Sequence, residues 1–326
     1  MRLVYLVCFS LFVFLGNSQI TYRKDFMAMG SGFQITVIAK DSLEASSAID
    51  LAIQEINRIE RLISSWDLNS ETSAINHEAG LRPTEVSSEL FSLIERANKI
   101  SLLTDGAFDI SYASMDKIWK FDGSVQDMPS KEEIAASISK VGFTKIILNP
   151  SERTVWLGEK GMKIGFGAIG KGYAADMAKS LLQNLGISSG IVNASGDMTT
   201  WGKQVNGKAW TVAITNPLNK DKAFATLPIT NGAVVTSGNY EKYISINGKR
   251  YTHIIDPRTG YPSSGLLSVT VFAPKAELAD ALATSVFVMG LETGIHRINQ
   301  IPGVECIVID EKGQLHSSNN IKIDKT

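Results

Sequence analysis

The segment from Gly165 to Asp176, written GFGAIGKGYAAD, holds the residues whose spacing comes nearest to known phosphate-binding motifs. Its beginning satisfies the G-x-G-x-x-G pattern of dinucleotide binding and also the G-x-x-x-x-G-K part of a P-loop. Glycines let a backbone approach phosphate oxygens, and a helix N-terminus attracts negative charge. The segment therefore predicts a ligand that carries phosphate.

Neither motif is complete. A Rossmann site needs an acidic residue about twenty positions further on, at the end of the next strand. Here the next expected strand ends at residue 194, and the first carboxylate after it belongs to Asp197. A P-loop needs a hydroxyl group directly after its lysine to hold the metal, and Gly172 offers none. Close helix packing is an alternative explanation for the first two glycines, but it does not explain Lys171.

The apolar segment from Ala279 to Met289 carries a carboxylate, Asp280, and a hydroxyl, Thr284. Residues four apart share one face of a helix. A carboxylate is costly to bury alone, so it needs a cation, a donor network or a metal. Oxygen ligands suit a hard ion such as Mg²⁺ rather than zinc. The alternative is an ordinary capped or solvated aspartate at a helix start.

His253 begins the sequence HIIDPRTG, which ends the clearest hairpin of the chain and enters a turn. Of the four histidines it alone has Asp, Arg and Gly close by at a strand exit, where functional sites are commonly built. Imidazole is the side chain best matched to proton transfer near neutral pH. His253 is therefore a candidate general base, and the alternative is that it pairs with Asp256 to hold the turn.

The elements that must position these residues follow from the hydrophobic pattern. Isoleucines recur at helical spacing from residue 49 to residue 63 and predict a long amphipathic helix. We expect strands at 33–39, 145–148, 154–157, 190–194, 243–246 and 249–254, and helices at 41–64, 87–103, 171–185 and 277–289, with a short helix after residue 130. This order favours an α+β fold with mixed and antiparallel sheets and flanking helices over strict βαβ alternation.

The N-terminus has the pattern of an export signal. Arg2 precedes an apolar run at residues 3–15 and a group of small and polar residues, which predicts a signal peptide at 1–18 ahead of one domain at 19–326. The run is short for a membrane-spanning helix, and an uncleaved anchor is the alternative. We expect an exported protein, in the periplasm or on the outer face of the inner membrane, with Cys306 as its one cysteine and no internal disulfide.

The charge balance bears on possible partners. Lys and Arg total 32 against 33 for Asp and Glu, which gives a formal net charge of −1. A nucleic-acid-binding domain usually carries a clear excess of basic residues. The composition therefore argues against nucleic acid as a partner.

Taken together, the motifs resemble those of the ApbE family of FAD:protein FMN transferases. In chain order they are MGSGF at 29–33, SSWD at 64–67, TDGAFD at 104–109, GAIGKGYAAD at 167–176, SGD at 195–197, TSGNY at 236–240, HIIDPRTGYP at 253–262 and ADALAT at 279–284. Any one of them could arise by chance, but the whole ordered series is specific. The resemblance covers nearly all of the chain after the expected signal and implies an ApbE-like, T-fold-like architecture.

The resemblance implies Mg²⁺-dependent transfer of FMN from FAD to a threonine hydroxyl of an acceptor protein, with release of AMP. It implies that Asp280, Thr284 and the backbone carbonyl of Ala168 hold Mg²⁺, and that His253 is the base. The residues that it implies for FAD binding are Met29, Trp66, Ala107, Phe108, Asp109, Gly165, Lys171 and Ile254. Among these, Lys171 is expected near the FAD phosphates.

Two departures from the family pattern matter. The family usually has Asp where this chain has Gly165, and it usually has a lipoprotein cysteine that this chain lacks. The acceptor is expected to carry a Ser/Thr-Gly-Ala-Thr-type motif, and membrane association could come through the acceptor or an uncleaved signal. Two other activities stay open, namely a Mg²⁺-dependent FAD pyrophosphatase and a non-catalytic FAD-binding protein.

Overall fold

The structure, a computed structural model, describes residues 19–122, 127–217, 219–238, 243–247 and 249–321. The predicted signal peptide at 1–18 lies outside these residues, as do the last two residues of the TSGNY motif. Within the described ranges, no helix has the length and apolar character needed to cross a membrane.

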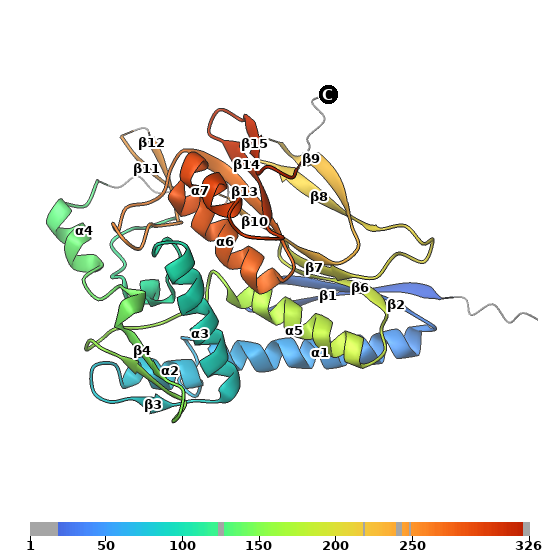
Figure 1. The fold of residues 1–326 in the computed structure, drawn as a ribbon, viewed down its shortest axis with the longest axis horizontal. Coiled ribbons are helices and arrows are strands. Elements are labelled where there is room, and N and C mark those ends of the chain that lie inside the picture. Colours follow the sequence, from blue (N-terminus) through green and yellow to red (C-terminus); the bar gives the residue numbers. More distant parts are fainter. Residues whose placement is uncertain (1–18, 123–126, 218, 239–242, 248, 322–326) are drawn as a thin grey trace, which may run out of the picture.

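An eight-stranded sheet forms the centre of the molecule, in the order β1-β2-β6-β7-β10-β13-β14-β15 (Figure 1). These strands are Ile20–Ala28, Ser31–Ala39, Ser189–Ala194, Asp197–Trp201, Gly232–Gly238, Leu266–Ala273, Glu305–Asp310 and Leu315–Ser317, in that order. All neighbouring strands run antiparallel. On β2, Phe33, Ile35 and Val37 are buried in the main core, because alternate residues of a strand face the same side.

Three long helices cover the buried face of this sheet: α1 (Ser42–Ile63), α5 (Gly170–Asn184) and α6 (Ala276–Met289) (Figure 1). α1 packs on β1 and β2, α5 on β6 and β7, and α6 on β10 and β13. α5 lies between the other two helices and contacts both. The short helix α7 (Leu291–Ile298) follows α6 and packs on it.

The remaining elements form smaller units around this layer. They are the helices α2 (Glu71–His77), α3 (Ser88–Leu103) and α4 (Lys131–Ser137), the 3₁₀ helices η1 (Ile110–Ser114) and η2 (Phe143–Lys145), and the strands β3 (Thr84–Glu85), β4 (Ile146–Asn149), β5 (Thr154–Leu157), β8 (Trp210–Asn216), β9 (Asn219–Ile229), β11 (Tyr243–Ile246) and β12 (Lys249–Thr252). The β11–β12 hairpin shares a second, small core with α4, in which Trp119, Ile134 and Ile244 are buried.

The α+β class and the antiparallel sheets predicted from the pattern are confirmed. The predicted helix start at Asp41 is also present, since its carboxylate accepts a hydrogen bond from the Glu44 N–H at 2.8 Å. The Glu44 side chain accepts from the N–H of Lys40, one residue before the cap, rather than from the cap itself. The strand β1 and the helix α2 were not predicted, because neither has a clear apolar period.

Candidate functional site

The segment with the phosphate-binding pattern forms a turn and then the first residues of α5. A Cβ atom added at Gly170, where the helix begins, would lie 2.7 Å from Cδ1 of Ile63 and 3.5 Å from Cε of Met29. The Met29 N–H in turn donates a hydrogen bond to Glu60 of α1 at 2.9 Å. Glycine at this position therefore lets the start of α5 approach the end of α1 and the β1–β2 turn, which carries the predicted FAD residue Met29.

Lys171, in the first turn of α5, forms an ion pair with Asp197, the first residue of β7. The Asp197 side chain is 3% exposed, and that of Lys171 is 31% exposed. Asp197 follows a tight turn in which Ser195 and Gly196 have φ angles of 56° and 103°. Burial raises the pKa of Asp197, and the nearby positive charge of Lys171 opposes that rise.

Asp280 lies on α6 directly opposite the start of α5. Asp280 is 5% exposed, and its Oδ2 accepts a hydrogen bond from the N–H of Gly172 at 3.2 Å. Burial raises the pKa of Asp280, the charge of Asp197 raises it further, and Lys171 opposes both effects. The carboxylate therefore lies in a place that is short of positive charge.

Thr284 follows Asp280 by four residues on α6, and its Oγ1 lies 3.4 Å from Oγ of Ser237 on β10. Ala168 lies in the turn before α5, half-buried against the main core. Among the described residues, no group of three or more His, Cys, Asp or Glu side chains could hold a metal ion together. The predicted set consists instead of a carboxylate, a hydroxyl and a backbone carbonyl, and these oxygens have the chemistry that a hard cation such as Mg²⁺ takes.

The start of α6 is held by a side chain of α5 rather than by its own cap. Lys275, at the cap position, makes no side-chain capping bond, whereas Asp176 accepts a hydrogen bond from the Glu277 N–H at 3.0 Å. The Glu277 carboxylate also accepts from Nε of Arg96 on α3 at 2.6 Å. Because free N–H groups at a helix start need acceptors, Asp176 fixes α6, and with it Asp280, against α5.

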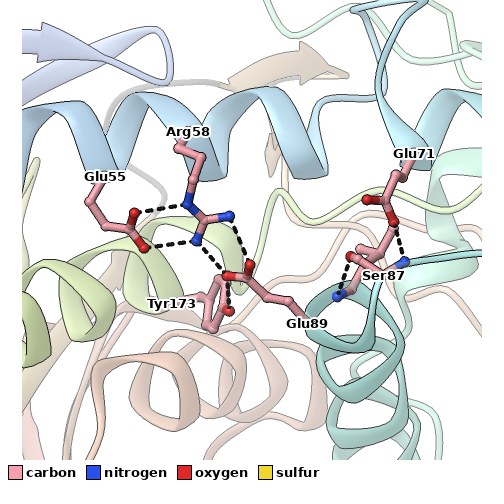
Figure 2. Close-up of polar contacts among 7 residues, drawn as sticks. Glu55, Arg58, Glu71, Ser87, Glu89 and Tyr173 are labelled. Atoms are coloured by element: carbon pink, nitrogen blue, oxygen red, sulfur yellow. Dashed lines mark hydrogen bonds and ion pairs between the residues drawn. The ribbon is translucent and has the colours of Figure 1, made fainter.

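Arg58 connects α1, α3 and α5 close to the start of α5 (Figure 2). Its guanidinium donates to Glu55 and to Glu89 at distances of 2.7–2.8 Å, and the hydroxyl of Tyr173 donates to Glu89 at 2.7 Å. The hydrogen bonds from Arg58 hold the pKa of Glu89 below its ordinary value, although burial acts in the opposite direction. Since Tyr173 follows Lys171 by two residues, this network supports the first turn of α5.

The predicted FAD turn at 107–109 lies between α3 and η1. Ala107 and Phe108 are almost completely buried. Both oxygens of Asp109 bind backbone N–H groups at 2.7 Å, one of Ser111 and one of Phe143, and burial raises the pKa of this carboxyl group. Asp109 therefore holds η1 and η2 in place, and its contact with FAD stays a prediction.

Trp66 is 81% exposed, and the ammonium of Lys117 lies 4.9 Å from the centre of its ring. A Cβ atom at Gly165 would lie 3.1 Å from Cβ of Ala113 and 3.9 Å from Oγ of Ser65, the residue before Trp66. Gly165 therefore lies between η1 and the loop that presents the tryptophan. An exposed indole ring in this place has the surface needed to stack on a planar ligand.

His253 follows β12, and its ring lies edge-on to that of Phe121, with centres 6.5 Å apart. Both carboxylate oxygens of Asp256 accept hydrogen bonds from Arg258 at 2.8 Å, so arginine holds this turn. A Cβ atom at Gly106 would lie 3.6 Å from Cγ of Arg258. The loop that carries the predicted base is therefore packed against the 104–109 turn.

Ile254, the last of the predicted FAD residues, is half-buried against the main core, and its carbonyl accepts from the N–H of Ser263 at 2.8 Å. Met29 and Asp280 both approach the start of α5, which carries Lys171: Met29 lies near Gly170, and Asp280 accepts a hydrogen bond from the N–H of Gly172. Near the other predicted residues, Ser65, next to Trp66, lies close to Gly165, and Arg258, on the loop of His253, lies close to Gly106. Asp197 was not predicted as a site residue, although the SGD motif that contains it was available as a signal.

Comparison with known proteins gives one consistent result. The sequence model of the ApbE family matches residues 29–308. A protein of Klebsiella pneumoniae (strain 342) named FAD:protein FMN transferase is 31% identical over 290 residues, which are 88% of this chain and 89% of that protein. A protein of the same name from Treponema pallidum (strain Nichols) is 29% identical over 316 residues, 92% of this chain and 87% of its own.

Solved structures share the architecture over the same extent. The ApbE protein of Thermotoga maritima superposes with a TM-score of 0.83 at 31% identity, over 92% of this chain and 97% of that one. The flavin transferase ApbE of Vibrio cholerae gives a TM-score of 0.79 at 27% identity, over 92% and 98%. The likeness thus extends over most of this chain and nearly all of both solved structures.

Proposed function

This chain belongs to the ApbE family, and we propose that it transfers FMN from FAD to a threonine hydroxyl of an acceptor protein, with Mg²⁺ as cofactor and AMP as product. As a family member it is a flavin transferase, and its relatives carry the name FAD:protein FMN transferase. The observation that carries the proposal is the buried carboxylate of Asp280 beside Lys171, at the start of α5. A pyrophosphate substrate needs a negatively charged group that binds its cation and a positively charged group that binds its phosphates.

In this proposal Asp280, Thr284 and the carbonyl of Ala168 would hold Mg²⁺, which when bound would supply positive charge to the pyrophosphate. Lys171 binds the phosphates from the other side. Trp66 and Met29 lie along the dinucleotide, where the exposed indole of Trp66 stacks on a ring. The charged end and the aromatic end of the site then orient FAD in one direction.

His253 takes the proton from the hydroxyl group of the acceptor threonine as the threonine oxygen attacks the FMN phosphorus. A new P–O bond to threonine forms, and the bond between that phosphorus and the oxygen bridging the two phosphates breaks, so that AMP leaves. The edge-on contact with Phe121 supports this role, because a packed imidazole ring keeps its orientation toward a substrate.

The proposed acceptor is an exported protein with a Ser/Thr-Gly-Ala-Thr-type motif, met in the periplasm or at the outer face of the inner membrane. The charge and apolar run at the start of the sequence support export. Cell fractionation tests this location. The intact mass of the purified protein shows whether the signal is removed from its N-terminus. A protein retained in the cytoplasm with an intact N-terminus would contradict it.

The transferase activity is tested by incubating the protein with FAD, Mg²⁺ and an acceptor that carries the motif. We expect covalent flavin fluorescence on the acceptor in a denaturing gel and an equal amount of AMP. An acceptor with valine in place of the threonine is the matched control and should stay unlabelled. AMP and FMN without labelling would make the protein a pyrophosphatase, and FAD binding without either product would make it a binding protein.

The metal assignment is tested separately with Asp280→Asn, which keeps the shape of the side chain and removes its charge. We expect this variant to fold, as seen by circular dichroism, and to lose Mg²⁺-dependent turnover. Normal turnover in the variant would remove Asp280 from the metal site.

A further inference from the structure

Three charged side chains meet at the start of α5, and their charges do not balance. Asp197 and Asp280 are almost completely buried, whereas Lys171 is partly exposed. With both carboxyl groups ionised, two carboxylates and one ammonium leave a formal charge of −1 in a region with little access to water. An uncompensated buried charge is costly. The N–H of Gly172 donates a hydrogen bond to Asp280, and burial raises the pKa of this carboxyl group to about 8.

Lys171 is placed to compensate both carboxylates at once. Its ammonium is paired with Asp197, and its positive charge also acts on Asp280. A lysine has a flexible four-carbon stem and a compact charge, so it can change partners without moving the helix. Its partial exposure gives the side chain room for such a movement.

We propose that Lys171 is a resident counter-ion that competes with the divalent cation for these carboxylates. In the ligand-free protein Lys171 lowers the affinity of the site for that cation. Once a divalent cation is present at Asp280, the formal charge of the cluster changes from −1 to +1, and Lys171 turns from Asp197 toward the phosphates of FAD. Asp197 is a positioning residue: it holds Lys171 while the cation is absent, and it adds negative charge in both states without being a metal ligand.

This inference rests on the proposed function, because it concerns the same cation and the same dinucleotide. It differs from a purely structural ion pair, remote from the cation, in the sign of one effect. Removing a lysine that acts only through the fold either weakens cation binding or leaves it unchanged. Removing a competing lysine strengthens it, because the repulsion between two positive charges is lost.

The test measures Mn²⁺ binding to the ligand-free protein by electron paramagnetic resonance, without FAD. We expect Lys171→Met to bind Mn²⁺ about tenfold more tightly and Asp197→Asn to bind about tenfold more weakly. The double variant restores the charge of the wild type and should bind within about threefold of it. Lys179→Met is the matched control, since it removes the same charge two turns further along α5 and should leave binding unchanged.

Asp280→Asn separates the two levels of the argument. If Asp280→Asn abolishes Mn²⁺ binding but Lys171→Met binds no more tightly than the wild type, the competition is refuted while the metal site stands. If Asp280→Asn binds Mn²⁺ normally, the metal assignment fails and the inference fails with it.

Lys171→Met leaves Asp197 buried without its partner and can therefore destabilise the fold. The comparison between Asp197→Asn and the double variant avoids this difficulty, because neither variant contains the buried carboxylate of Asp197. The competition predicts that the double variant binds Mn²⁺ about tenfold more tightly than Asp197→Asn. Equal or weaker binding by the double variant would overturn the inference.

Discussion

A side chain at Gly172 of α5 would meet the backbone of α6, and Gly172→Ala perturbs the site while it leaves every charged group in place. A Cβ atom at this position would lie 2.2 Å from the carbonyl oxygen of Ala276 and 2.9 Å from the backbone nitrogen of Glu277. These are backbone atoms of α6, so a change of rotamer cannot make room. The helices must separate if alanine is to fit.

The size of the effect follows from this distance. Real Cβ atoms essentially never approach other atoms within 3.0 Å, so the shift must be at least 0.8 Å, the difference from 2.2 Å. Forcing a methyl group into a packed interface costs about 1–3 kcal/mol. Alanine in a helix gains about 1 kcal/mol over glycine, which offsets part of that cost. The same shift lengthens the hydrogen bond from the Gly172 N–H to Asp280, and we expect a net loss of about 2 kcal/mol.

The assay combines urea unfolding with Mn²⁺ binding on the same preparation. We expect Gly172→Ala to unfold at a lower urea concentration and to bind Mn²⁺ more weakly, because Asp280 moves away from the start of α5. Gly32→Ala is the control, since a Cβ atom at that glycine meets no atom within 4 Å. Wild-type stability and Mn²⁺ affinity in Gly172→Ala would refute the view that this contact sets the geometry of the site.

Three further variants test other parts of the site and its support. His253→Ala should lower the rate of flavin transfer by about 10²–10⁴-fold with FAD still bound, and loss of FAD binding instead would make the histidine structural. Glu89→Gln should lower the free energy of unfolding by about 1–3 kcal/mol at neutral pH. Arg58 lowers the pKa of Glu89 in the folded protein below the ordinary value of 4.5. The difference in stability between the wild type and Glu89→Gln is therefore fully present above pH 4.5, and it should disappear as the pH falls through the pKa of Glu89 in the folded protein. Gly165→Asp introduces a carboxylate where the resemblance predicts contact with FAD, and its Cβ atom requires a small shift of Ala113. Flavin fluorescence should report a changed dissociation constant for FAD. An unchanged constant would place Gly165 away from the dinucleotide.

Much of the scaffold could be predicted from local patterns. The isoleucine period of α1 and the two short strands of the β11–β12 hairpin are patterns that extend over a few residues, and the structure has both the helix and the hairpin. The pair Asp280 and Thr284 was likewise readable, because helical spacing alone places both on one face of α6. Such features depend on residues that are neighbours in the sequence.

The contacts that make the site were not predictable in the same way. Asp197 meets Lys171 only because β7 lies beneath α5, and Asp176 caps α6 although 101 residues separate it from Glu277. The close approach at Gly172 also needs a partner helix that no local pattern names. These contacts depend on the relative placement of whole elements, which composition and periodicity do not encode.

The two ends of the proposed site have opposite character. At the start of α5, buried Asp197 and Asp280 lie near Lys171. At the other end, Trp66 is exposed with Lys117 over its ring, and Gly165 adds no charge. Negative charge is thus concentrated at the start of α5, which in the proposed function gives a divalent cation one favoured position and leaves the aromatic end for the rings of the substrate.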